Sequence, residues 1–289
     1  MVREVEGVLN LKAADVFVDC TLGLGGHSWE LGSKLGHSGR LVGIDQDDAA
    51  ITKAKERLAK LACRVDIVKS NFHKLDQVLD SLGIAQVDAF LFDLGVSSLQ
   101  LDEAERGFSF RKEGPLDMRM DVAAPLTALE LVHSLSEEEL SSLIWKYGED
   151  RFSRRIAKAI VRARASRPLE TTKDLADIIL HSIPNSYQRD KIHPATRTFQ
   201  ALRMAVNSEL DVLSVALDKA FLKLKTHGRM AVIAFHSLED RIVKEKFRLL
   251  AHEGRAEILT KKPLRPSEEE SSDNPRSRSA RLRALERIA

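Results

Sequence analysis

The chain has 289 residues, 43% of them hydrophobic and 30% charged, as expected for a soluble globular protein of one or two domains. Its formal net charge of +2 is nearly balanced, so a surface that binds nucleic acid must be a local patch. Cys20 and Cys63 are too few for a disulfide framework or a metal cluster, so we expect a reducing, cytoplasmic location and no metal. No apolar run reaches the roughly 18 residues of a membrane span, and the N-terminus lacks a signal peptide's apolar core.

The glycine-rich segment Asp19-Cys-Thr-Leu-Gly-Leu-Gly-Gly-His27 organises the first half of the chain. The apolar run Val16–Val18 before it predicts a buried parallel strand, and a helix with Ser28 as its N-cap is predicted after it. The glycines of the segment allow the backbone to turn sharply and to approach a ligand closely. A strand, a glycine loop and a helix together form the nucleotide-binding half of a doubly wound sheet.

The next predicted strand, Arg40–Asp45, ends in an acid. Asp45 lies about twenty residues past the glycine loop, the spacing at which a carboxylate reaches the ribose hydroxyls of a bound nucleotide. The loop departs from the G-x-G-x-x-G fingerprint that binds a pyrophosphate, which favours S-adenosylmethionine over NAD. The alternative is an ordinary strand–helix turn followed by a chance acid.

Three more side chains follow predicted strands at the same edge of the sheet. Phe72 comes after the third predicted strand, Arg64–Val68, where it either stacks on the ligand or packs in the core. Asp93 ends the fourth strand, which should lie beside the first, so it falls either where cofactor meets substrate or in a cap of the next turn. His236 follows the fifth strand and is a candidate general base, although a structural role is commoner for histidine.

The alternation of strands and helices stops after Gly95, and no strand is predicted between Leu101 and Ala205. Residues 102–205 are therefore expected to form an inserted all-helical domain, and residues 1–101 and 206–289 the sheet domain around it. Helical periodicity predicts helices over Thr127–His133, Ser136–Lys146, Arg151–Ala165, Thr172–Ser182 and Pro194–Leu217.

The helix predicted from residue 151 is the most basic part of the chain, and no acid interrupts its charge. Its basic residues are Arg151, Arg154, Arg155, Lys158, Arg162 and Arg164. Charge on a helix is usually a solvated face, but charge of a single sign favours binding to the phosphates of a nucleic acid.

The sheet is predicted to resume with strands at Gly228–Phe235 and Ala256–Thr260. Ser267–Asn274 is predicted to be a polar acidic loop. The alternation of apolar and charged residues in Ser279–Ile288 predicts an edge strand with one face in water. Seven strands that end in a hairpin are typical of the class I S-adenosylmethionine-dependent methyltransferases, which have a Rossmann-like α/β fold.

Motifs spread from residue 16 nearly to the end of the chain share one pattern. They are Asp19–His27, Asp93–Asp102, Glu105–Phe110, Gly114–Asp121, His193–Arg203, Asn207–Leu210, Phe235–Arg241 and Asn274–Ser279. In combination they closely resemble the ribosomal RNA small subunit methyltransferase H, or MraW, family. Members usually carry a His-x-Pro-Val-Leu segment before the first helix, and this chain opens inside that region, so the resemblance leaves the substrate-side lid of the cofactor pocket open.

The resemblance implies methyl transfer from S-adenosylmethionine to the exocyclic N4 of a cytidine in the decoding (P-site) region of 16S rRNA, in the small ribosomal subunit. It implies cofactor contacts at Gly25, Gly26, His27, Asp45, Phe72, Asp93 and Gln100. Of these, His27 and Gln100 come from the resemblance alone. A homodimer is left open.

Asp93 is also the predicted catalytic residue, because a cytosine amine needs hydrogen-bond acceptors beside it while its nitrogen attacks the methyl group. The backbone carbonyls of Leu94 and Gly95 are further candidates for this role. Asp117 and Asp121, in a later loop, rank behind Asp93.

Three other classes of protein compete with this interpretation. A nicotinamide-dependent oxidoreductase shares the glycine loop and Asp45 but should carry a third glycine at pyrophosphate spacing. An RNA-binding protein on an inactive fold is disfavoured by the intact loop and both acids. An amino-methyltransferase for DNA, or for another nucleic acid, usually has Asp/Asn/Ser-Pro-Pro-Tyr after the fourth strand, where this chain has Asp93-Leu-Gly-Val.

Overall fold

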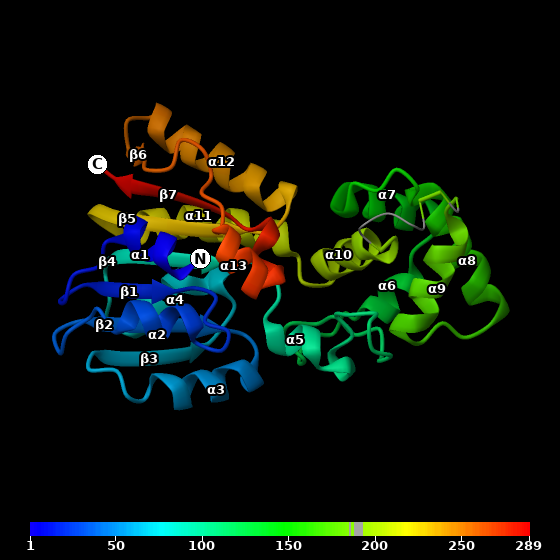
Figure 1. The fold of residues 1–289 in the computed structure, drawn as a ribbon, viewed down its shortest axis with the longest axis horizontal. Helices are drawn as coiled ribbons and strands as arrows, with labels where there is room; N and C mark the ends of the chain where they lie inside the picture. The colour runs from blue at the N-terminus through cyan, green and yellow to red at the C-terminus, as the bar shows by residue number, and fades with distance from the viewer. Residues whose placement is uncertain (185, 188–192) are drawn as a thin grey trace. The chain divides into compact units, whose positions relative to one another are not determined.

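The computed structural model divides the chain into two compact units (Figure 1). The sheet unit combines Met1–Gly95 with Leu210–Ala289, and the helical unit is Val96–Glu209. Residues 96–101 and 206–209, which the predicted boundaries assigned to the sheet domain, thus belong to the helical unit. The residues that the structure describes are 1–184, 186–187 and 193–289.

Among the described residues, the sheet unit holds a seven-stranded sheet with the order β3-β2-β1-β4-β5-β7-β6. Figure 1 shows this order running from β3 at the bottom of the unit to β6 at the top. The strands are β1 Val16–Asp19, β2 Arg40–Asp45, β3 Arg64–Lys69, β4 Val87–Asp93, β5 Leu224–Ala234, β6 Ala256–Ile258 and β7 Arg281–Arg287. β1 pairs in parallel with both β2 and β4, so the strand order reverses beside it. At such a switch point a crevice forms beyond the carboxyl ends of the strands.

Helices cover both faces of this sheet. Their bounds are α1 Val2–Leu9, α2 Gly26–Gly32, α3 Asp48–Leu58, α4 Leu75–Ser81, α11 Glu209–Lys223 and α12 Ser237–His252. Neighbouring strand residues such as Phe90 and Leu91 fall in different apolar clusters, one packed with α4, α11 and α12 and the other with α1, α2 and α3. The strands read as continuous apolar runs because both of their faces are buried.

The prediction of an edge strand at Ser279–Ile288 is wrong. β7 lies between β5 and β6 and pairs antiparallel with both. Its charged residue Arg283 is only 8% exposed, because its guanidinium donates to both carboxylate oxygens of Asp240 at 2.7 and 3.2 Å. A charged residue at alternate positions of a strand can therefore be buried in an ion pair, and the sequence pattern is then the same as for a face in water.

The acidic segment predicted as a loop instead contains a helix, α13 Glu268–Asp273, followed by the 3-10 turn η3 Pro275–Ser279. The Ser267 hydroxyl caps α13 by accepting from the backbone N–H of Glu270 at 3.1 Å. Glutamates occupy the first turn, where the helix dipole favours negative charge.

The helical unit packs its helices around an apolar cluster of its own. Its elements are α5 Ser98–Asp102, η2 Ala104–Arg106, α6 Ala128–Ser134, α7 Glu137–Gly148, α8 Ser153–Ser166, α9 Thr172–Ser182 and α10 Ala195–Val206. Thr127, Ser136 and Thr171 start α6, α7 and α9 with capping boxes, as their sequence patterns suggest. In the described part of this unit, the only β pairing is an isolated bridge between Pro115 and Thr171.

One predicted helix, Pro194–Leu217, is two helices. α10 ends before Asn207, and Ser208 takes a left-handed conformation at φ 50° before α11 begins. The Asn207 side chain causes the break, because it donates to the Met118 carbonyl and accepts from the Met120 N–H, each at 2.8 Å. These bonds hold the long loop of the unit against α10. No helix among the described residues is long and apolar enough to cross a membrane.

Candidate cofactor site at the carboxyl edge of the sheet

The glycine loop joins β1 to α2 through Gly25, which is the N-cap of the helix. Gly25 has φ 72°, a left-handed conformation that other residues rarely adopt, and a Cβ there would lie 3.4 Å from the Leu58 side chain. α2 begins at Gly26, so the prediction that Ser28 caps it is wrong. Ser28 lies in the first turn and donates its hydroxyl hydrogen to Asp19 Oδ2 at 2.7 Å. The hydroxyl therefore anchors the helix to the end of β1.

Asp45, at the end of β2, is tied to the glycine loop. One carboxylate oxygen accepts from the Gly23 N–H at 2.7 Å and the other from the Asp47 N–H at 2.9 Å. Burial raises the pKa of Asp45, and these two backbone bonds oppose that rise. Each carboxylate oxygen has a second lone pair, so Asp45 can accept from ribose hydroxyls while it holds the loop.

Asp93, at the end of β4, pairs with His27 of α2. Its Oδ2 lies 3.3 Å from His27 Nδ1, and the two side chains are 30% and 19% exposed. The backbone N–H of Asp93 donates to the Thr21 hydroxyl at 2.6 Å. Asp93 Oδ1 and His27 Nε2 are buried and have no hydrogen-bond partner among the described residues. Two polar atoms at this edge are thus available to a ligand.

Asp19 is the second acid of this cluster and is 1% exposed. Burial raises its pKa to about 6, although the Ser28 hydroxyl and the nearby His27 lower it. Burial also acts to lower the pKa of His27, but the hydrogen bond and charge of Asp93, with the charge of Asp19, raise it overall. The carboxylates of Asp93 and Asp19 therefore favour the protonated form of His27.

Phe72 begins the turn η1 Phe72–Lys74, directly after β3 and Asn71. It is half-buried and packs edge-to-face on Phe92, with ring centroids 5.8 Å apart. The core interpretation is thus confirmed for part of the ring, and stacking on a ligand stays a prediction.

Gln100, Asp117 and Asp121 lie in the helical unit. Gln100 is 5% exposed, and its side-chain oxygen accepts from the Ser97 N–H at 3.1 Å in the capping box of α5. Asp117 forms an ion pair with Arg119 at 2.6 Å, which lowers its pKa against the effect of burial. Asp121 accepts from the Ala123 N–H at 3.0 Å. Both acids therefore stabilise their own loop, which agrees with ranking them behind Asp93.

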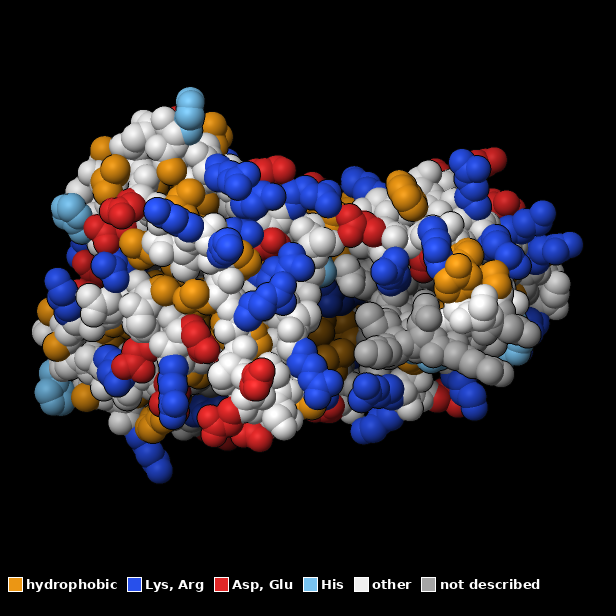
Figure 2. Space-filling view, turned by 45° about the horizontal axis from the view of Figure 1, so that its top comes forward, with side chains coloured by type: hydrophobic (Ala, Val, Ile, Leu, Met, Phe, Trp, Pro, Cys, Tyr) orange, Lys and Arg blue, Asp and Glu red, His pale blue; other side chains and the backbone are white. Residues whose placement is uncertain are grey.

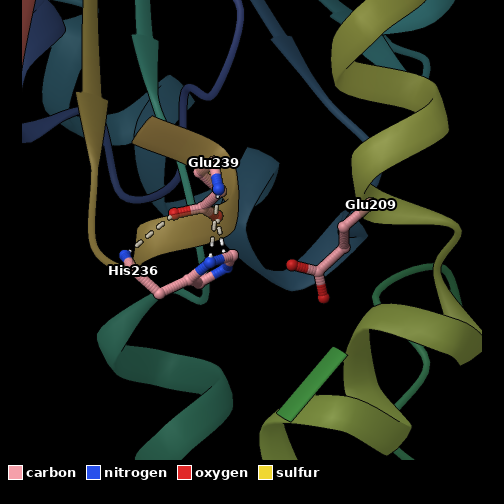
Figure 3. A group of neighbouring side chains, drawn as sticks. All are labelled: Glu209, His236 and Glu239. Atoms are coloured by element: carbon pink, nitrogen blue, oxygen red, sulfur yellow. Dashed lines mark hydrogen bonds and ion pairs between the residues drawn. The ribbon is translucent and has the colours of Figure 1, made fainter. Parts of the chain in front are cut away.

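His236 has a structural role at the start of α12. It is the N-cap of the helix, and its Nε2 lies 3.1 Å from a carboxylate oxygen of Glu239, which is 3% exposed (Figure 3). The Glu239 carboxylate also accepts from the Phe235 N–H at 2.9 Å. The buried carboxylate thus closes the turn between β5 and α12, which favours the structural interpretation of His236 over a general base.

The basic helix is α8, and its six predicted phosphate-binding residues fall into two groups. Four are exposed and have no ion pair among the described residues: Arg154, Arg155, Lys158 and Arg162. Arg151 instead lies over the Tyr187 ring, 4.0 Å from its centroid. Arg164 donates to the Val132 carbonyl. These last two side chains are at least partly committed to the packing of the helical unit.

Sequence reasoning missed the roles of Asp19, Thr21 and Ser28. Thr21 supports Asp93 across two strands, and Asp19 also accepts from the Thr21 N–H at 3.1 Å. The signal was an acid at the end of the first strand with hydroxyls two and nine residues further on. Only the fold brings the Ser28 hydroxyl within hydrogen-bonding distance of the Asp19 carboxylate.

The fold and this edge together define a class of protein. The sheet order, the glycine loop after β1 and the acids that end β2 and β4 are those of a class I methyltransferase. The sequence profile of the MraW methylase family matches residues 1–288. The chain therefore belongs to the MraW methylase family, and the prediction from its motifs is confirmed.

Curated relatives agree with this family. Ribosomal RNA small subunit methyltransferase H of Brevibacillus brevis is 47% identical over 100% of this chain and 96% of its own length. Proteins of the same name are 48% identical in Clostridium botulinum, over 100% and 97%, and 47% identical in Clostridioides difficile, over 97% and 95%. The alternative of a nicotinamide-dependent oxidoreductase is wrong.

Two solved structures are more distant. An rRNA methylase from Streptococcus thermophilus has 11% identity and a TM-score of 0.47, and the match covers 100% of this chain and 94% of the other. An S-adenosylmethionine-dependent O-methyltransferase from Thermotoga maritima has 12% identity and a TM-score of 0.45, over 100% and 64%. The family assignment rests on the sequence profile and the sequence relatives.

S-adenosylmethionine is the cofactor of this methyltransferase. The carboxyl edge of the sheet fits this cofactor chemically. The left-handed turn at Gly25 lets the backbone approach a ligand closely. The buried atoms Asp93 Oδ1 and His27 Nε2 lack hydrogen-bond partners in the described residues.

Proposed function

We propose that this protein methylates the exocyclic N4 of a cytidine in the decoding region of 16S rRNA. Family membership and the names of the relatives support an rRNA of the small ribosomal subunit as substrate. The observation that carries the chemistry is the acid at the end of β4, held by His27 and Thr21 and with one oxygen unpartnered among the described residues. A homodimer and a cytoplasmic location stay predictions.

The cofactor contacts proposed here lie mostly on the loops after β1, β2 and β3. Asp45 accepts from the ribose, and Gly25 and Gly26 let the backbone approach the ligand. Phe72 offers the free part of its ring to the adenine. The remaining contacts are proposed at His27, Asp93 and Gln100.

S-adenosylmethionine supplies an electrophilic methyl group when it is bound. The protein must make the amine more nucleophilic, because the lone pair of N4 is delocalised into the cytosine ring. Asp93 and the carbonyls of Leu94 and Gly95 accept hydrogen bonds from the amine and localise that lone pair. Holding N4 in line with the methyl group can lower the barrier by up to roughly 7–11 kcal/mol.

His27 and Thr21 are positioning residues in this proposal. His27 fixes one carboxylate oxygen of Asp93, so that the other oxygen keeps a defined direction. The Thr21 hydroxyl fixes the backbone of the same residue. The target base must leave its stack to reach such a site.

The helical unit is proposed to recognise the substrate. The exposed side chains of α8, Arg154, Arg155, Lys158 and Arg162, carry four positive charges with no ion pair among the described residues. Phosphates neutralise such charges and release counterions from the RNA, which makes binding depend strongly on salt.

The test is to identify the methylated nucleoside. Small subunits from cells that lack the gene are incubated with the purified protein and S-adenosylmethionine, and their rRNA is digested and analysed by mass spectrometry. N4-methylated cytidine in a decoding-region fragment is the expected product. A methyl group on another atom, or on an rRNA fragment outside that region, would contradict the proposal.

A further inference from the structure

A pocket of about 430 Å³ lies in the sheet unit between α12, β6 and the segment after β6. One face of α12 lines it with Lys244, Phe247, Arg248 and Ala251, at the spacing of successive helical turns. β6 is the edge strand, four strand spacings from β1, which is about 19 Å at about 4.8 Å per spacing. The pocket is therefore separate from the cofactor site.

The pocket has an apolar floor and a basic rim. Phe247 and Ala256 on the floor are 2% and 4% exposed. Lys244, Arg248 and Lys261 line the pocket with long cationic side chains, and none has an ion pair within the described residues. Pockets of roughly 300–1,000 Å³ accommodate small organic ligands, so this volume suffices for one nucleotide unit.

The positive charge of the rim is not balanced locally. Arg283 also lines the pocket, but Asp240 neutralises it. Glu257 is the one acid among the described lining residues, where it faces Lys244, Arg248 and Lys261. In Figure 2, Lys and Arg side chains gather across the upper part of the sheet unit, where Figure 1 places α12.

Other lysines on α12 and on the neighbouring helix α11 form ion pairs with acids. Lys246, two residues after Lys244, forms an ion pair with Asp218 of α11. Lys223 of α11 likewise pairs with Asp80. These two lysines are thus paired with neighbouring helices, whereas Lys244 and Lys261 of the pocket have no ion pair in the part of the chain that the structure describes. Uncompensated like charges around a concavity attract a polyanion.

We infer that this basic pocket binds a second segment of the rRNA substrate, taking one nucleotide against its apolar floor and the flanking phosphates on Lys244, Arg248 and Lys261. Both side chain types suit phosphates, because lysine offers a mobile point charge and the planar fork of arginine can bind two phosphate oxygens. Bases and riboses pack on apolar surfaces without regard to sequence. The inference rests on the proposed function for its choice of RNA over other polyanions.

The experiment compares RNA binding by the parent protein and by the variant K244E/R248E/K261E. Fluorescence anisotropy with a labelled decoding-region fragment of 16S rRNA is measured between 50 and 200 mM salt. We expect at least a tenfold weaker affinity and a log–log salt slope reduced by about 2.1, from three phosphate contacts of about 0.7 each, the value for a single strand. Affinity for S-adenosylmethionine, measured by calorimetry, should not change.

The matched control reverses three exposed lysines on and after α3, on the opposite face of the sheet: Lys53, Lys55 and Lys60. None of them forms an ion pair with another described residue. K53E/K55E/K60E has the same change in net charge and should keep most of the affinity. If reversal impairs folding, K244Q/R248Q/K261Q is used, with about the same loss of slope expected. Excess cytidine monophosphate should compete weakly, since a free nucleotide offers one phosphate.

Equal affinity and salt slope in the pocket variant and the control would overturn the inference. Strong competition by the free nucleotide would also overturn it, in favour of a small-molecule site. If the parent binds and methylates rRNA but the pocket variant matches the control, only the second site fails. If the parent methylates small subunits but does not bind the rRNA fragment, the second site fails and the proposed function stands, and if it does neither, both fail.

Discussion

Replacing Asp93 with Asn removes the charge at the end of β4 and keeps the size of the side chain. The backbone of residue 93 should stay in place, because its N–H still donates to the Thr21 hydroxyl at 2.6 Å. What changes is the pairing with His27, now 3.3 Å from Oδ2, and the acceptor offered to the amine. Fold and cofactor affinity should therefore survive, the latter within a few-fold.

Loss of a positioned acid–base group lowers rates by about 10²–10⁴. This corresponds to about 2.7–5.4 kcal/mol of transition-state free energy at about 1.36 kcal/mol per tenfold. The assay is single-turnover methylation of small subunits with excess enzyme, which separates chemistry from product release.

Asp88→Asn is the matched control, since Asp88 lies on the same strand and pairs with Lys225 at 2.8 Å. It should methylate at nearly the parent rate. If Asp93→Asn keeps the parent rate and loses only cofactor affinity, Asp93 is a cofactor ligand and the proposed chemistry is wrong.

Three further predictions follow from the same geometry. Asp45→Ala should weaken S-adenosylmethionine binding in calorimetry by on the order of 1.5–3 kcal/mol for each lost hydrogen bond, and unchanged affinity in a folded variant would refute the ribose contact. R155E/K158E/R162E on α8 should weaken RNA binding and flatten its salt dependence without affecting the cofactor, whereas equal slopes would exclude phosphate contacts there. The pKa of Asp19, about 6 when folded, lies above its unfolded value, so its contribution to stability is full below about pH 4 and is lost as the pH rises through about 6. Urea unfolding should therefore show that Asp19→Asn removes a decline of up to about 3 kcal/mol over that range, and parallel pH curves for parent and variant would contradict the raised pKa.

The sequence by itself determined the parallel half of the sheet and its functional edge. Strands buried on both faces must be apolar along their length, so each parallel strand could be recognised in the sequence as a continuous run of apolar residues. A polar residue that ends such a run must lie at the carboxyl edge. Asp45 and Asp93 could therefore be placed there from the sequence alone.

Only the tertiary structure decided which polar residues are paired and which are available. Arg283 looked exposed until Asp240, 43 residues away, neutralised it inside the sheet. Ser28 looked like a cap until β1 brought Asp19 within 2.7 Å of its hydroxyl. Asn207 broke a periodic helical pattern by bonding to Met118, 89 residues earlier. The periodicity of a sequence indicates which positions of a helix or strand face the core. Whether a polar side chain at such a position is neutralised or hydrogen-bonded depends on a partner that is distant in the chain.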